Sequence, residues 1–220
     1  EEKDMAYFPM FLQLEGKECL VVGGGAVAFR KVKALKDFGA KVSVVSPKII
    51  REIQEMEEVV CEFRSFDVSD LKNKELVIAA TNQTRENHKI SLACRQRGIP
   101  INAVDQKEDC SFIFPAYIKQ GDGVAAFSSG GKSPVAAQYM KDCMEPIMTK
   151  RLGEMIEYLG SIRNIIKEQI GSETQRKALF QEILTIGLEE DRIPENWELD
   201  RMIHKYNRKS REEIWTERDD

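Results

Sequence analysis

The sequence predicts an α/β protein that begins with a Rossmann domain, a doubly wound and mostly parallel sheet, followed by a small α+β segment and a helical domain. Two observations carry this prediction. In the first half, short apolar runs alternate with amphipathic helical patterns that end at glycines, which is typical of repeated βαβ units. After residue 105 the pattern changes to two neighbouring strands and then to helices alone.

The first βαβ unit is complete within about 30 residues. Residues 19–22 are apolar on both faces, as a buried parallel strand requires, and residues 41–45 form the second strand. The helix between them is expected to end at Gly39, a residue suited to a left-handed C-terminal cap. The inward face of this helix is predicted to consist of Ala28, Val32, Leu35 and Phe38.

The turn Gly23-Gly24-Gly25 joins the first strand to this helix. Gly23 permits a tight turn, Gly25 lets the backbone approach a phosphate, and Ala28 takes the third small position of the G-x-G-x-x-G/A pattern. In this context the pattern favours a dinucleotide site over a turn without phosphate. The second strand ends without an acidic residue for a ribose hydroxyl and without an arginine for a 2′-phosphate. Lys48 is close, so the sequence favours NAD over NADP only slightly.

The βαβ pattern continues to residue 105. We expect two helices, over 48–57 and 84–97. Three strands are expected over 59–63, 75–80 and 101–104. In the second helix Ile90, Leu92 and Ala93 are expected to point inward, and Gly98 to end it. Ligands of such sheets gather at the carboxyl ends of the strands. Four segments are predicted to lie there: the Gly23 turn, Ser46-Pro47-Lys48, Thr81-Asn82 and Asp105.

The region after residue 110 predicts a different structure. Strands over 111–116 and 123–127 are expected to pair antiparallel. The loop 128–134, Ser-Ser-Gly-Gly-Lys-Ser-Pro, precedes a helix over 135–150, with Ser133 as N-cap and Pro134 at the first helical position. A helix start after Gly-Gly-Lys is suited to binding an anion; the alternative is an ordinary flexible loop with a cap.

The last third of the chain is expected to be helical over 152–170 and 174–188, with a solvated helix or frayed tail over 205–220. The first of these helices carries an apolar stripe that is typical of a core or an interface. The stripe consists of Ile156, Leu159, Ile162, Ile166 and Ile170.

The composition is that of a soluble globular protein. The 220 residues, 42% hydrophobic and 32% charged, suffice for one Rossmann domain and something smaller. The net charge of −4 gives no general support for nucleic-acid binding. No apolar run reaches the roughly 20 residues of a membrane span, and the start does not resemble a signal peptide, so we expect a cytoplasmic protein. The five cysteines contain no C-x-x-C pair and favour buried free thiols over disulfides or a zinc site.

Asp105 is the main candidate for chemistry, because a carboxylate at the end of a strand beside the crevice can transfer protons or approach a metal ion. The alternative is an aspartate that only opens a turn. His88 lies within a predicted helix and His204 in the polar C-terminal region, so neither is expected to be a ligand or a base. Serine-based catalysis therefore lacks a histidine partner.

Several motifs, in this order, resemble the precorrin-2 dehydrogenase/sirohydrochlorin ferrochelatase family, the N-terminal module of siroheme synthase. They are Tyr7-Phe8-Pro9-Met10-Phe11-Leu12, Val22 to Ala28 with Arg30-Lys31, Ala79-Ala80-Thr81-Asn82, Asn102-Ala103-Val104-Asp105, Phe112 to Ala116, and Ser128 to Pro134. The resemblance covers residues 7–150. From residue 151 onward the chain carries no matching motif.

The resemblance implies NAD-dependent oxidation of precorrin-2 to sirohydrochlorin, with Asp105 as the catalytic residue, and it leaves iron insertion open. It implies a homodimer that exchanges the segment after the Rossmann domain, and a site of phosphorylation at Ser129. The expected domains are 1–114 for NAD binding, 115–150 for dimerisation and 151–220, helical with a charged tail. The implied cofactor contacts are Gly23, Gly25, Ala26, Val27, Pro47, Lys48 and Thr81.

A polyanionic tetrapyrrole needs a cationic cradle on an acidic protein. Lys132 and the helix start after Ser133 are the favoured candidates, whereas Arg30 and Lys31 are expected to face solvent. The predicted substrate contacts are Ser128, Ser129, Gly130, Lys132 and Ser133. No metal ligands are predicted, since no Cys/His cluster is visible. Two other functions stay open, a nucleotide-sensing Rossmann module without turnover and a small-molecule dehydrogenase of another pathway.

Overall fold

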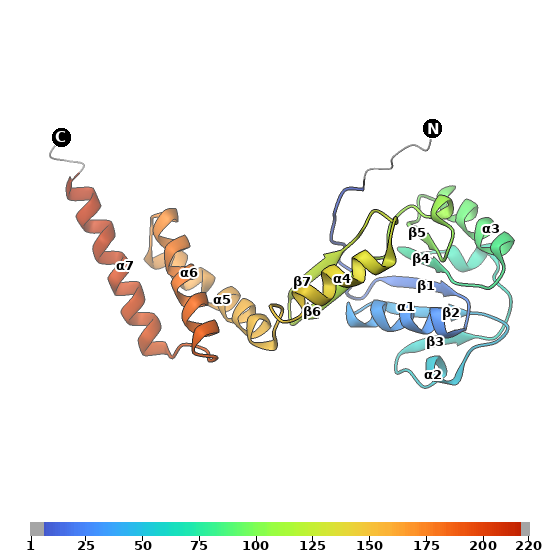
Figure 1. The fold of residues 1–220 in the computed structure, drawn as a ribbon, viewed down its shortest axis with the longest axis horizontal. Coiled ribbons are helices and arrows are strands. Elements are labelled where there is room, and N and C mark those ends of the chain that lie inside the picture. The colour runs from blue at the N-terminus through green and yellow to red at the C-terminus, as the bar shows by residue number, and fades with distance from the viewer. Residues whose placement is uncertain (1–6, 217–220) are drawn as a thin grey trace. The chain divides into compact units, whose positions relative to one another are not determined.

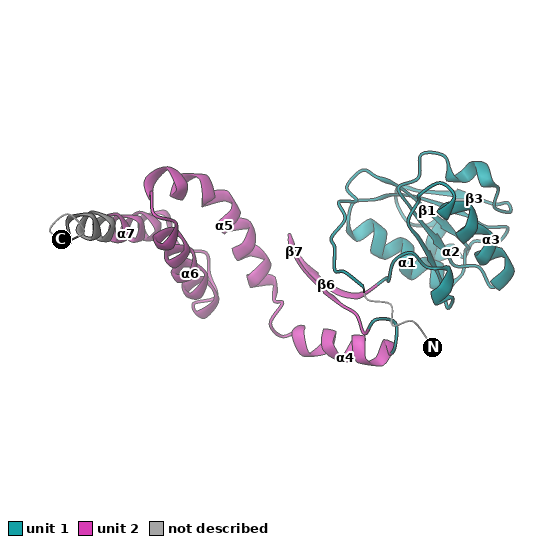
Figure 2. Cartoon of the chain, turned by 90° about the horizontal axis from the view of Figure 1, so that it is seen from above, with its two compact units in different colours: residues 1–114, 130–132 teal, residues 115–129, 133–220 magenta. Residues whose placement is uncertain are grey.

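The computed structural model describes residues 7–216, and the side chains of residues 7–207. Its contacts divide the chain into two compact units, coloured separately in Figure 2. Unit 1 consists of residues 1–114 and 130–132, and unit 2 of residues 115–129 and 133–220. Each unit contains its own hydrophobic core.

Unit 1 is built on a five-stranded parallel sheet with the strand order β3-β2-β1-β4-β5 (Figure 1). Its strands are β1 (Glu18–Val22), β2 (Lys41–Val45), β3 (Val59–Glu62), β4 (Leu76–Ala79) and β5 (Ile101–Ala103). The chain adds β2 and β3 on one side of β1 and then β4 and β5 on the other. The predicted doubly wound sheet is confirmed, and its topological switch point lies between β1 and β4, where such folds bind ligands.

Helices cover both faces of this sheet. On one face, α1 (Ala26–Asp37) and α2 (Arg51–Gln54) pack on the apolar side chains of β1 and β2. On the other, α3 (Thr84–Arg95) and the 3₁₀ turn η1 (Val68–Leu71) cover β4 and β5. As predicted, α1 stops at Gly39, which has a φ of 72° and donates its N–H to the Lys36 carbonyl at 2.9 Å.

Two predicted helices of unit 1 differ from the structure. The helix expected over 48–57 is reduced to the single turn α2, because Ile50 donates its N–H to the Gly24 carbonyl at 2.8 Å and so holds the preceding segment against the glycine turn. In α3, Leu92 is 47% exposed and not inward. The inward face of α3 includes polar residues and consists of Asn87, Ile90, Ser91, Ala93 and Cys94.

The strand expected over 111–116 is also wrong. Residues 112–115 form no strand, and residues 112–114 belong to unit 1, where Phe112 and Phe114 pack against the sheet core. The carbonyl of Phe112 accepts a hydrogen bond from the Asn102 amide at 3.1 Å. The apolar alternation of this segment therefore reflects side chains that cover the core, while the hairpin strand starts only at Ala116.

Unit 2 begins with an antiparallel hairpin of β6 (Ala116–Gln120) and β7 (Gly123–Phe127). Four helices follow: α4 (Pro134–Met144), α5 (Lys150–Gln169), α6 (Glu173–Glu189) and α7 (Asn196–Thr216). The last three enclose a core to which the predicted stripe contributes Ile162, Ile166 and Ile170. At Gly187 of α6 a Cβ would lie 2.3 Å from the Met155 sulfur, so the buried Met155 side chain of α5 packs directly on Gly187.

Two helix boundaries in unit 2 differ from the expectation. The helix predicted over 135–150 ends at Met144, since Pro146 cannot continue it and Thr149 instead caps α5 by accepting the Leu152 N–H at 3.1 Å. The solvated tail predicted over 205–220 is partly core, because α7 starts at Asn196 and buries Tyr206. Residues 217–220 lie outside the described range.

Two general expectations are tested by burial and helix length. All five cysteines are free thiols, but only Cys19 and Cys94 are buried, and Cys143 is exposed. Within the part of the chain that the structure describes, no helix has both the length and the apolar character needed to cross a membrane.

Candidate active site

The first two glycines of the turn after β1 pack directly against neighbouring backbone. Gly23 has a φ of 124°, and a Cβ there would lie 2.3 Å from the Ala80 carbonyl oxygen and 3.1 Å from the Thr81 nitrogen. A Cβ on Gly24 would lie 2.2 Å from the Lys48 carbonyl oxygen. The segments after β2 and β4 therefore touch the turn. In this way the structure brings Gly23, Lys48 and Thr81 of the predicted cofactor set together.

Gly25 lies in a different environment, because a Cβ there would meet nothing within 4 Å. It is the N-cap of α1, no side chain caps this helix start, and no acidic residue lies in its first turn. Ala26 is exposed and Val27 half-buried. The first N–H groups of α1 thus lack acceptors within the helix and are accessible, which is the arrangement that receives a phosphate. The residues present fit the pyrophosphate of a dinucleotide.

The corner after β2 exposes the side chains of Pro47 and Lys48. Its backbone is tied to the next strand, since the Ser46 N–H donates to the Glu62 carbonyl at 3.1 Å. As the sequence indicated, the corner itself carries no acidic side chain.

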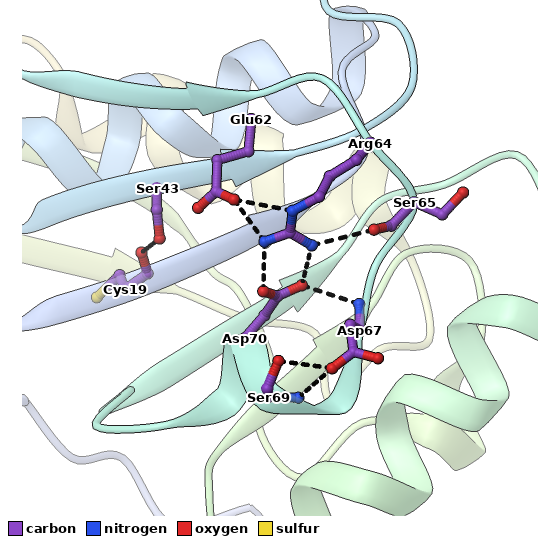
Figure 3. A network of polar contacts seen from close by, with 8 residues as sticks. All are labelled: Cys19, Ser43, Glu62, Arg64, Ser65, Asp67, Ser69 and Asp70. Carbon is purple, nitrogen blue, oxygen red and sulfur yellow. Dashed lines mark hydrogen bonds and ion pairs between the residues drawn. The ribbon is translucent and has the colours of Figure 1, made fainter.

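Beside this corner, Arg64 is engaged by two carboxylates (Figure 3). Its guanidinium pairs with Glu62 and donates to both carboxylate oxygens of Asp70, at 2.8 and 2.6 Å. These bonds hold the pKa of Asp70 below its usual range. Asp70 also accepts the Asp67 N–H at 2.9 Å, which fixes η1. Arg64, which sequence reasoning did not weigh, is therefore already paired with two carboxylates.

Thr81 is fixed by Asn87 of α3, a residue that sequence reasoning did not single out. The N–H and hydroxyl of Thr81 donate to the Asn87 side-chain oxygen at 3.2 and 2.7 Å, and the Asn87 amide donates back to the Thr81 carbonyl at 3.2 Å. Asn87 is only 2% exposed. Because the Asn87 side chain is buried and bonds to both the backbone and the hydroxyl of Thr81, the end of β4 is held rigidly beside the glycine turn.

Asp105 follows β5 in a tight turn that is closed by the Gln106 N–H and the Ala103 carbonyl, 3.3 Å apart. It has a left-handed φ of 60°, which is unfavourable for a residue with a Cβ, and its side chain is exposed. The Cys110 thiol lies against this turn, 3.2 Å from the Ala103 carbonyl and 3.3 Å from the Gln106 carbonyl. Burial raises the pKa of Cys110, so it remains a thiol near neutral pH.

The residue after Asp105 is anchored by a buried carboxylate. Asp109, in the 3₁₀ turn η2 (Lys107–Asp109), is 4% exposed and accepts the Gln106 amide at 2.7 Å. Its other oxygen lies 2.7 Å from Nδ1 of His88. His88 thus has a structural partner that its position in the sequence did not reveal. Within the described residues, no three His, Cys, Asp or Glu side chains gather closely enough to hold a metal ion.

Lys31 does not face solvent as the sequence suggested. It is half-buried on α1, and its ammonium lies 3.7 Å from the centre of the Phe114 ring. Burial, with a smaller contribution from Arg30, lowers the pKa of Lys31 to about 8, while Cys110 and Asp105 oppose this shift. Arg30 is exposed, as expected. Lys31 is therefore a cation of unit 1 in the electrostatic range of Asp105.

The predicted substrate loop is anchored at its unit 2 end. The Ser129 hydroxyl accepts the Ser133 N–H and donates to the Ser133 carbonyl, both at 2.8 Å. Ser133 caps α4 as predicted, accepting the Ala136 N–H at 3.1 Å, and Pro134 occupies the first turn. The side chain of Ser128 is exposed.

The middle of this loop belongs to unit 1. Gly130 and Gly131 adopt left-handed φ values of 66° and 77°, and Lys132 is exposed. A Cβ on Gly131 would lie 3.5 Å from the side chain of Lys107. The structure therefore brings the centre of the loop beside η2, two residues from Asp105.

Comparisons with known proteins add a family to this geometry. Residues 10–116 match the family described as "Putative NAD(P)-binding". Siroheme synthase from Nitrosomonas eutropha is 35% identical over 82% of the chain and 39% of its own length. Siroheme synthase from Zymomonas mobilis is 37% identical over 80% of the chain and 38% of its own length. The chain thus spans about two fifths of these relatives.

The fold also has a solved counterpart. The structure of SirC, a precorrin-2 dehydrogenase, superposes with a TM-score of 0.66 at 22% identity and covers 92% of this chain and 100% of its own. The match extends over most of the chain and supports the same overall fold.

Proposed function

Because this chain belongs to the precorrin-2 dehydrogenase/sirohydrochlorin ferrochelatase family, the N-terminal module of siroheme synthase, we propose that it oxidises precorrin-2 to sirohydrochlorin with NAD. One observation carries the proposal. The open start of α1, the Lys48 corner and the rigid Thr81 strand end adjoin one glycine turn, and Asp105 projects from the same edge of the parallel sheet.

The preference for NAD over NADP is supported by the charges near the end of β2. A 2′-phosphate needs a cationic partner, and Arg64 is already paired with Glu62 and Asp70. The exposed Lys48 is the cation of the corner itself. We therefore expect weak NADP binding, which Lys48 alone sustains.

In the proposed reaction two hydrogens leave the substrate, one as hydride and one as a proton. Bound NAD supplies the hydride acceptor. The exposed Asp105 carboxylate accepts the proton, and the turn closed by Gln106 and Ala103, with Cys110 packed against it, fixes where that carboxylate stands. The buried Asp109 anchors Gln106 and so keeps the turn in place.

The test is an anaerobic assay of NADH formation from precorrin-2 and NAD with the wild-type chain, Asp105→Asn and Asp122→Asn. Asp122 is an exposed hairpin residue of unit 2 and serves as the matched control. We expect Asp105→Asn to bind NAD normally and to lose at least about 100-fold in turnover, the lower range for a positioned acid or base. Asp122→Asn should match the wild type.

Two results would contradict the proposal. Wild-type protein that binds NAD and changes its assembly state without forming NADH would indicate a nucleotide-sensing module. Full turnover in Asp105→Asn would remove that carboxylate from the mechanism while leaving the dehydrogenase assignment intact.

The remaining expectations are part of the same proposal. Ser128, Ser129, Gly130, Lys132 and Ser133 would bind the tetrapyrrole, and Fe²⁺ would be a substrate if the chain also inserts iron. A cytoplasmic homodimer is proposed, with residues 1–114, 115–150 and 151–220 as its domains. The dimer is supported by α4, none of whose residues is buried within the chain, and whose Val135 and Tyr139 are 78% and 68% exposed. Sedimentation of Tyr139→Ser tests it.

A further inference from the structure

Lys31 is a half-buried cation that lies over an aromatic face. Its ammonium lies 3.7 Å from the centre of the Phe114 ring, and within the described residues no carboxylate lies at ion-pairing distance from it. Burying a charge is unfavourable unless a partner compensates it. A cation–π contact supplies only about 0.5–2 kcal/mol, so this ammonium is suited to a further anionic partner.

The position of Lys31 decides which kind of anion could reach it. It lies one and a half turns into α1, beyond the first-turn N–H groups that fit the pyrophosphate. The Asp105 carboxylate is close enough to act on its pKa, and Phe114 belongs to the same core side of unit 1. Lys31 therefore lies on the side of the site that the reacting part of the substrate would occupy.

We propose that Lys31, seated on the Phe114 ring, binds a carboxylate of the tetrapyrrole and so holds the substrate in register with Asp105. This inference rests on the proposed function, because it needs a polycarboxylate substrate. It assigns to Lys31 a direct substrate contact and to Phe114 the role of positioning the ammonium.

The protonation of Lys31 gives the proposal a pH signature. Burial has the largest effect on the pKa of Lys31 and lowers it, as does the neighbouring Arg30. Cys110 and Asp105 raise it, and the resulting pKa is about 8. The substrate carboxylates are ionised throughout this range. Affinity should therefore be constant below pH 8 and fall above it as the free ammonium loses its proton. The pKa of Cys110 is raised above its usual value, so this thiol does not titrate in the same window.

The experiment measures anaerobic binding of sirohydrochlorin, a tetrapyrrole polycarboxylate, by absorbance titration from pH 7 to pH 9. It uses the full chain as wild type, Lys31→Met, Lys31→Arg and Lys33→Met, the last being an exposed lysine on the same helix. NAD binding and thermal unfolding are measured on each protein. These two readouts establish that the fold and the dinucleotide site are intact.

We expect Lys31→Met to weaken sirohydrochlorin binding by about 10- to 100-fold, the range of a charge-assisted hydrogen bond, and to abolish the pH dependence. Lys31→Arg should keep most of the affinity and lose the fall above pH 8. Lys33→Met and all NAD affinities should be unchanged. A Lys31→Met protein that binds sirohydrochlorin like wild type would overturn the inference and leave the proposed function standing.

Two further outcomes separate the inference from the function. If Lys31→Met weakens NAD binding as much as sirohydrochlorin binding, Lys31 serves the dinucleotide, and the assignment to a substrate carboxylate is wrong. If the wild-type chain binds NAD but no sirohydrochlorin, the proposed function and this inference fail together.

Discussion

Replacing Gly23 with alanine is expected to destabilise unit 1 strongly, whereas the same change at Gly25 should leave its stability nearly unchanged and weaken cofactor binding. The two glycines are two residues apart in one turn but lie in opposite environments. Gly23 has a φ of 124° and faces the Ala80 carbonyl, and Gly25 is extended, with a φ of −95°, and faces open space.

The magnitudes follow from these environments. For Gly23→Ala, the backbone conformation costs about 1–3 kcal/mol, and the overlap with a backbone atom 2.3 Å away costs about a further 1–3 kcal/mol. The sum, about 2–6 kcal/mol, is a large part of the 5–15 kcal/mol that typically stabilises a domain. For Gly25→Ala the expected change in stability is within about 0.5 kcal/mol. Its methyl group would displace a phosphate from the first-turn N–H groups and weaken NAD binding by about 10- to 100-fold.

The assay combines urea unfolding, followed by circular dichroism, with calorimetric titration of NAD. The wild type gives the reference for both measurements. Unchanged stability in Gly23→Ala would refute the argument from close packing. Unchanged NAD affinity in a folded Gly25→Ala protein would show that no phosphate lies against the start of α1.

The remaining predictions concern the structure around the site and in unit 2. Gly187→Ala should destabilise unit 2 by about 1–3 kcal/mol, because its methyl group would overlap with the Met155 side chain of α5. Gly160→Ala, whose methyl group meets nothing within 4 Å, should stabilise unit 2 by up to about 1 kcal/mol. Urea unfolding of both variants checks this, and equal effects would contradict it. The Arg192 guanidinium holds the pKa of Glu198 at about 2. The pair therefore stabilises the folded state above the unfolded pKa of about 4.3 and loses this contribution as the pH falls toward 2. Thermal melts of Glu198→Gln and wild type should differ at pH 7 and converge in acid. Asp109→Ala removes the closer acceptor of the buried Gln106 amide, which keeps the Thr84 carbonyl, and should cost about 1–3 kcal/mol in unfolding experiments. We also expect it to loosen the Asp105 turn and lower turnover at unchanged NAD affinity.

The sheet of unit 1 could be predicted because its signals are local. Each strand is a short apolar run, and Gly39 after α1 adopts the left-handed backbone conformation expected of a glycine that ends a helix. The register of β1 with β4 and the strand order depend on contacts between distant segments, so they could not be predicted from local sequence patterns. The helix predicted over 48–57 was too long for the same reason. The Ile50 N–H bonds to the Gly24 carbonyl, and this contact, not helical propensity, decides where the segment lies.

The candidate site shows the same division. Gly23, Thr81 and Asp105 follow strands, and topology alone brings strand ends together. Their supports were not visible, because Asn87 and Asp109 are polar residues that become buried only through partners distant in sequence. Lys31 was assigned to solvent because a lysine on a surface helix usually lies there, and only the Phe114 ring reveals its burial.

The discontinuity of unit 1 affects how the protein can be divided. A fragment ending at Phe114 keeps the whole sheet but loses residues 130–132, which belong to the same unit and adjoin Lys107. Such a fragment would be an incomplete domain, and a loss of function in it would say nothing about the helices it lacks. A permuted or shortened protein that preserves unit 1 must contain residues 130–132 as well as the sheet. A chain cut after Lys132 keeps all of unit 1, whereas a chain cut before the β6–β7 hairpin does not.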